Sequence, residues 1–121
     1  ITVPANALGP NGQIVAGHQC WPNGASYTAR IRYSGFAGTV VLAQASTAQL
    51  AGQVLIGNRN SAALQVSTLY SGYQVLSSIT SPQYLTVDTT ADTTIVYTLT
   101  KDSATTSVVL ETGQVSLAFK A

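Results

Sequence analysis

Apolar and polar residues alternate along much of this chain with the two-residue period of a β-strand. The clearest stretch is 27–33, where aromatic and aliphatic residues at odd positions alternate with threonine and arginine at even positions. Successive side chains of a strand point to opposite faces, so this stretch predicts one buried face and one solvated face. Similar patterns predict strands at 13–20, 54–57, 94–100, 108–110 and 115–120, and weaker patterns predict strands at 39–43, 63–70 and 83–87.

Turn signals separate these stretches at intervals of about 8–12 residues, the spacing typical of a β-sandwich or barrel. Asn11-Gly12 favours a type I′ turn, in which both central residues have positive φ. Asn58-Arg59-Asn60 predicts another turn. The stretch 43–52, rich in Ala and Gln, is ambiguous, and a helical turn and a loop both fit it. The pattern therefore predicts one all-β domain over residues 1–121.

The alternation also divides the aromatic residues into two groups. Those expected to face the core are Tyr27, Tyr33, Tyr97 and Phe119. Those in or beside predicted loops are Trp21, Tyr70, Tyr73 and Tyr84. Exposed Trp and Tyr side chains bind sugars and protein partners, but a loop aromatic also serves to cover the open end of a sandwich. Both readings stay open for the second group.

Two arginines, Arg30 and Arg32, share the polar face of one predicted strand. They are suited to bind a carboxylate or a sugar of a partner, or they are simply solvated. The candidate surface-binding residues are therefore Trp21, Arg30, Arg32, Tyr70, Tyr73 and Tyr84.

Charged residues make up only 7% of the chain, and the formal net charge is +1. Soluble domains usually carry about a quarter. A neutral surface rich in hydroxyl groups is poorly suited to nucleic acid, because phosphate binding needs clustered Lys and Arg. Weak self-repulsion also makes association easy. This composition favours a protein that works outside a cell or inside a larger assembly.

The inventory of groups for acid–base chemistry is poor. His18 and Cys20 lie two residues apart on one strand face, about 7 Å from each other, which is too far for a catalytic pair. One His and one Cys also cannot complete a metal site. Asp88 and Asp92 lie among hydroxyl residues that offer oxygen ligands for calcium, but Asp at turns more often bonds its own backbone. We expect no catalytic residue, no metal and no cofactor.

Cys20 is the only cysteine, so no internal disulfide forms; it is either a small buried side chain or the site of an intermolecular bridge. No apolar run reaches the length of a membrane span, and we expect no membrane insertion. The chain begins at Ile1 rather than Met, which predicts a fragment or processed part of a longer structural protein.

Four stretches together resemble a small β-domain of tailed-bacteriophage tail fibres, tailspikes and related virion appendages. Each is built of common turn residues, and they occur in the family's order along nearly the whole chain. They are Val3–Gly12, similar to the family's opening Pro-Ala-x-x-Leu/Met-Gly-x-Asn-Gly; Ala29–Gly35, similar to its basic second strand; Ile56–Ala62, similar to its Asn-Arg turn; and Val87–Thr94 with Val109–Val115, similar to its Val-Asp-Thr stretch and closing Leu-Glu strand. One departure is visible, since the family usually closes on an acidic strand and this chain reads Ser116-Leu117-Ala118-Phe119-Lys120.

The resemblance implies a jelly-roll-like antiparallel β-sandwich, a homotrimer that contacts other virion proteins, and a location in the virion or outside the cell. It implies a non-enzymatic role: attachment to a glycan or protein of the host surface, stabilisation of the trimer, or both.

Two other functions remain possible on the residues alone. One is a self-assembling subunit, such as a capsid decoration protein or a pilus-like filament, in which an extended N-terminal segment adds a strand to a neighbour. The candidate assembly residues are Ile1, Val3 and Phe119. The other is an enzyme that acts on carbohydrate, which the shortage of acid–base groups disfavours.

Overall fold

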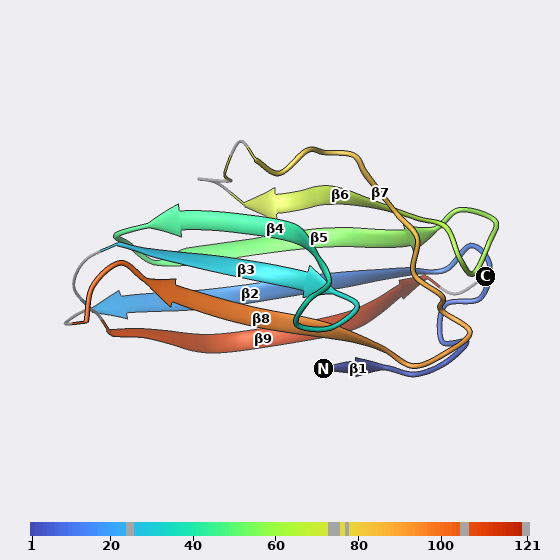
Figure 1. The fold of residues 1–121 in the computed structure, drawn as a ribbon, viewed down its shortest axis with the longest axis horizontal. Coiled ribbons are helices and arrows are strands. Elements are labelled where there is room, and N and C mark those ends of the chain that lie inside the picture. The colour runs from blue at the N-terminus through green and yellow to red at the C-terminus, as the bar shows by residue number, and fades with distance from the viewer. Residues whose placement is uncertain (24–25, 73–75, 77, 105–106, 120–121) are drawn as a thin grey trace.

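A computed structural model describes residues 1–23, 26–72, 76, 78–104 and 107–119 of the chain. Within these ranges every regular element is a β-strand and no helix occurs (Figure 1). The strands are β1 (Thr2–Val3), β2 (Gln13–Asn23), β3 (Tyr27–Tyr33), β4 (Thr39–Ser46), β5 (Leu50–Asn58), β6 (Gln65–Gly72), β7 (Gln83–Leu85), β8 (Thr93–Lys101) and β9 (Ser107–Phe119).

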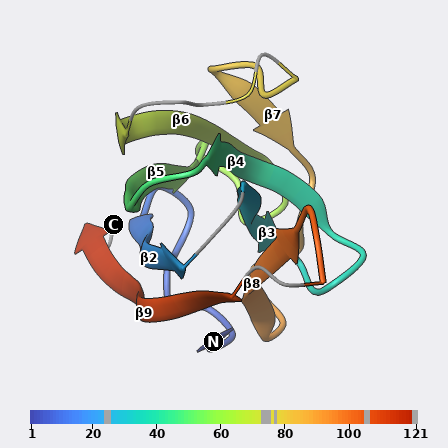
Figure 2. The ribbon, with the colours of Figure 1, turned by 90° about the vertical axis from the view of Figure 1, so that its left-hand side faces the viewer.

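The strands form two antiparallel sheets that pack face to face, as the end-on view in Figure 2 shows. The four-stranded sheet has the order β1-β8-β3-β4, and we call it sheet I. The five-stranded sheet has the order β7-β6-β5-β2-β9, and we call it sheet II. The predicted all-β antiparallel sandwich is confirmed, and its chain crosses repeatedly from one sheet to the other.

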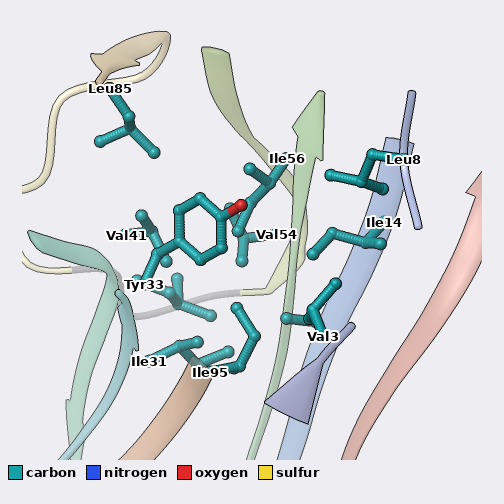
Figure 3. Close-up of a cluster of buried hydrophobic side chains, with 12 residues drawn as sticks. Val3, Leu8, Ile14, Ile31, Tyr33, Val41, Val54, Ile56, Leu85 and Ile95 are labelled. Atoms are coloured by element: carbon teal, nitrogen blue, oxygen red, sulfur yellow. The ribbon is translucent and has the colours of Figure 1, made fainter. Parts of the chain in front are cut away.

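The core lies between the sheets where the alternation predicted it. In β3 every odd-numbered residue is buried and every even-numbered residue is half-buried. Tyr33 and Ile31 of sheet I meet Val54 and Ile56 of sheet II in the larger cluster of buried side chains (Figure 3). A smaller cluster contains Cys20, which is fully buried. Burial raises the pKa of this thiol to about 11, so the small-hydrophobe reading of Cys20 is the one that the structure supports.

The ambiguous stretch 43–52 is neither a helical turn nor simply a loop. It contains the end of β4 in sheet I and the start of β5 in sheet II, joined at residues 47–49. Gln44 is fully buried, and its amide nitrogen donates a hydrogen bond to the carbonyl oxygen of Ala51 across the sandwich, at 3.3 Å. A β-carbon at Gly52 would collide with the Gln44 amide. Pairing between distant strands therefore overrides the weak local preference of this segment.

The predicted type I′ turn at Asn11-Gly12 is wrong, because neither residue has a positive φ. The left-handed positions in this loop are Asn6, with φ 58°, and Gly9, with φ 65°. Gly12 is instead needed for space, since a β-carbon there would overlap the carbonyl group of Leu8. The turn after β5 agrees with its prediction, and Asn60 has φ 53°.

The last strand is more exposed than its alternation suggests. Leu117 lies on the inner side of sheet II, opposite buried Ile14, yet 53% of its surface is accessible. Leu117 is exposed because β9 is the edge strand of sheet II, and the strand of sheet I on that side, β1, is too short to cover it. Tyr97 is half-buried and its hydroxyl donates to the carbonyl oxygen of Gln114, at 2.7 Å. The side chain of Phe119 lies outside the described residues.

A buried network of uncharged side chains holds three loops together at one end of the sandwich. The amide nitrogen of Asn58 donates to the Gly9 carbonyl oxygen (2.6 Å) and to the Thr89 hydroxyl (2.9 Å). The amide of Gln65 bonds both the carbonyl oxygen and the N–H of Val87, at 2.8 Å each, and also reaches the Asn58 side chain. The network therefore joins loops that are far apart in the sequence.

Replacing Gln65 with Ala tests how much this network stabilises the fold. The variant leaves the N–H and C=O groups of half-buried Val87 without their side-chain partner, and an unsatisfied buried group costs about 1–3 kcal/mol. We expect the free energy of unfolding, measured by urea denaturation, to fall by about 3 kcal/mol. Thr86→Ala, at an exposed position in the same loop, is the control and should change it by less than about 0.5 kcal/mol. Equal stabilities of the two variants would show that the network is not what closes this end.

Candidate functional site

An open groove of about 380 Å³ crosses the outer face of sheet II. Its lining comes from four neighbouring strands: Gly17 and Gln19 of β2, Ala51 and Gln53 of β5, Ser71 of β6, and Thr112 and Gln114 of β9, with His18 and Gly52 beneath. The strand register brings these residues together, because Gln19 lies between Ala51 and Thr112, and Gly17 lies between Gln53 and Gln114. The groove is therefore a direct product of sheet pairing.

Small residues between long ones hollow out this face. Gly17 and Ala51 are flanked by glutamine side chains, and a β-carbon at Gly17 would come within 3.0 Å of Cγ of Gln53. The hydroxyl of Ser71 donates to the amide oxygen of Gln53, at 3.2 Å, which orients that amide. The floor is thus open, and the walls offer amide and hydroxyl groups that both donate and accept hydrogen bonds.

Trp21 lies on the same face of sheet II as the groove, beyond Gln19. It follows Gln19 by two residues on β2, so both side chains project from the same face about 7 Å apart. Its ring is 55% exposed and lies across from Val109 of β9, which is similarly exposed. Trp21 was expected in or beside a loop, but it lies on β2, where it is exposed on the outer face of sheet II.

The face that carries the groove is almost free of charge. The five strands of sheet II contain one charged residue, Glu111, which lies at a bulge of β9. Arg30, Arg32 and Lys101 all belong to sheet I. Electrostatic attraction of a charged ligand therefore has little source on this face.

The structure places the two predicted arginines on the opposite side of the sandwich from Trp21. Arg30 donates to the hydroxyl of Thr100 at 3.2 Å. Arg32 lies 6.0 Å from the ring centre of Phe36 and donates to the carbonyl oxygen of Gly38. Both are half-buried and held by their own sheet, so they do not join Trp21 in one site.

The predicted tyrosines do not gather around the groove either. Tyr84 is exposed on β7 and stacks on Arg59, whose guanidinium carbon lies 4.7 Å from the ring centre. Tyr70 is exposed beside Ser71, at the irregularity where β6 meets β5. Tyr73 lies outside the described residues. The glutamines that line the groove were missed, because each comes from a different strand and the stretch 43–52 had no strand prediction.

Among the residues that line the groove, the titratable side chain is that of His18. Burial lowers the pKa of His18, and its contact with Gln44 acts in the opposite direction. Across the described residues, no three His, Cys, Asp or Glu side chains come together. Asp88 accepts hydrogen bonds from the N–H and hydroxyl of Thr90, which lower its pKa, and Asp92 accepts one from the N–H of Ala5. Asp88 thus bonds the backbone of its own turn, as expected, whereas Asp92 bonds the loop after β1.

The candidate assembly segment is already paired within the chain. β1 adds to β8 with Thr2 opposite Thr94, and the amino group of Ile1 donates to the carbonyl oxygen of Ile95, at 2.9 Å. Ile1 is 54% exposed and Val3 is buried. In this structure β1 completes sheet I of its own chain.

No protein-family model, no curated protein and no solved structure matches this chain. A helix of the length and apolar character needed to cross a membrane is not found in the part of the chain that the structure describes.

The buried position of His18 makes a pH-dependent stability test possible. Its folded pKa is below the ordinary 6.5, so the unfolded chain takes up a proton first as the pH falls. We expect the free energy of unfolding to be constant above about pH 7 and to decrease from about pH 6.5 downward, until the folded pKa is reached. His18→Gln should remove this decrease between about pH 7 and 5, where Asp88 does not titrate.

Urea denaturation of both proteins across this pH range measures the effect. Asp88→Asn is the matched control, and it should change the slope of the profile only below about pH 5, where the Asp88 carboxyl of the unfolded chain begins to take up a proton. Parallel pH profiles for the natural chain and His18→Gln would contradict the burial effect.

Proposed function

We propose that this β-sandwich is a non-enzymatic attachment domain of a virion appendage, and that it binds an uncharged glycan of the host surface through the groove on sheet II. The observation that carries the proposal is the lining of that groove, which is polar and neutral, together with the exposed Trp21 two residues along β2 from Gln19.

The chemistry of the groove suits a sugar. A pyranose ring carries hydroxyl groups that donate and accept hydrogen bonds, and side-chain amides such as Gln19 and Gln53 do both. The apolar face of a sugar packs on an aromatic ring, and Trp21 presents one about 7 Å along the strand from Gln19. An open concave site also fits a chain that continues beyond the bound residues.

The same lining supports attachment rather than turnover. General acid–base catalysis needs a titratable group within hydrogen-bond reach of the substrate. The titratable side chain at the groove is His18, which is only 5% exposed and points between the sheets. No lining residue in the described part of the chain is a carboxylate.

The placement in a virion appendage rests on the resemblance and on the composition. A neutral sandwich whose loops are closed by buried amides suits a particle that persists outside a cell. Three of the resembling stretches, Val3–Gly12, Ile56–Ala62 and Val87–Thr94, meet in the network of Asn58, Gln65 and Thr89. The proposal of a virion appendage therefore depends on these resembling stretches. The proposal of glycan binding depends on the groove.

Binding of glycan arrays and of whole host cells tests the proposal. We expect Trp21→Ala to weaken binding about three- to tenfold, the range for losing one aromatic contact. Gln53→Ala should weaken it by a similar factor. Because the ligand is neutral, raising the salt concentration should leave the affinity nearly unchanged.

Tyr84→Ala is the matched control, since Tyr84 is even more exposed than Trp21 but lies on β7 away from the groove. It should bind like the natural chain. Binding only to acidic glycans, or equal loss in the Trp21 and Tyr84 variants, would contradict the proposed site. Failure to adsorb to any glycan or cell would favour a purely structural role.

A further inference from the structure

The edge strands of the two sheets differ in how well they are protected from pairing with another chain. In the described part of the chain, the edge of β4 is met by Leu76, whose N–H donates to the carbonyl oxygen of Ala43. β7 has three residues, and in neighbouring β6 the N–H of Leu69 donates a hydrogen bond to the hydroxyl oxygen of Ser81. β1 has two residues and is followed by Pro4. Short or covered edges such as these prevent pairing with other chains.

The edge of β9 lacks such protection. This strand has 13 residues, contains no Pro or Lys, and carries one charge, Glu111. The pairing with β2 is irregular at Glu111 and between Leu117 and Phe119, but from Thr112 to Leu117 the register with β2 is continuous. A regular, uncharged edge of this kind presents a row of unpaired backbone groups to another strand.

Exposed apolar side chains lie along the same edge. A small groove of about 160 Å³ between β1 and β9 is lined by Ile1, Val3, Pro4, Ala7, Val115 and Leu117, among others. Leu117 is 53% exposed and Ile1 is 54% exposed, on the two sides of this groove. The edge therefore combines free backbone groups with apolar surface that a further strand would cover.

We propose that β9 pairs antiparallel with β9 of a second copy of this chain, about a two-fold axis at Val115. Residues that face one another across an antiparallel pair lie on the same side of the sheet, so inward residues must meet inward residues. An axis at Val115 places Leu117 opposite Gly113, whereas an axis at Gln114 places Leu117 opposite Glu111. The first arrangement buries no charge next to a leucine.

The second copy is favoured as occupant because the strand is complementary to itself. With the axis at Val115, the two Glu111 carboxylates lie at opposite ends of the paired strands and do not repel each other. Such an isologous contact closes at two copies. It differs from the trimer that the resemblance implies, so the mass of the assembly distinguishes them.

Sedimentation equilibrium over a range of concentrations tests the pairing. The natural chain should show a reversible monomer–dimer equilibrium. Leu117→Lys places a charge on the paired edge and should weaken the dimer by at least about tenfold. Leu64→Lys, at a 45% exposed position outside the strands, should leave the equilibrium unchanged.

Hydrogen exchange provides a second readout that does not depend on a variant. The backbone amides of 112–117 should become more protected as the concentration rises, and those of β7 should not. A monomer at the highest soluble concentration, a trimer, or a dimer unaffected by Leu117→Lys would each overturn the proposal.

Discussion

The buried amides of Asn58 and Gln65 are the contacts on which the closed end of this sandwich depends. Where loops pack against one another, some of their backbone groups lose contact with water, and those groups need other partners. A side-chain amide both donates and accepts, so it satisfies them without adding a charge. Gln44 does the same between the sheets, where its amide nitrogen reaches the Ala51 carbonyl. Side-chain amides, rather than ion pairs, therefore hold these loops in place in a domain that has very few charged residues.

The fold was predictable where each strand carries its own pattern. β3 alternates so regularly that its buried and exposed faces follow from the sequence, and β2 was placed with its start at Gln13. The segments 43–52 and 115–119 were not predictable in the same way. Gln44 is buried because a strand of the facing sheet accepts its hydrogen bond. Leu117 is exposed because β9 is the edge strand of sheet II and the strand of sheet I on that side, β1, has only two residues. Both outcomes depend on partners far away in the sequence.

The candidate site was likewise predictable only in part, because its groove is formed by residues that are far apart in the sequence. Its exposed aromatic, Trp21, was identified from the sequence, because a tryptophan beside a turn is a visible signal. Gln19, Gln53 and Gln114 were not, since an isolated glutamine in a strand has no distinctive pattern and only the register joins the three. Arg30 and Arg32 had the stronger individual signal, yet they are bound within sheet I on the opposite face.

β9 takes part in both proposed contacts, and its geometry keeps them compatible. Thr112 and Gln114 line the groove with side chains on the outer face, whereas strand addition uses backbone groups at the edge. A second copy added at that edge extends sheet II sideways and leaves its outer face uncovered. The two-fold axis then places two grooves on one continuous surface. Two weak sites held rigidly on one surface bind a repeating polymer or a crowded cell surface far more tightly than either site alone.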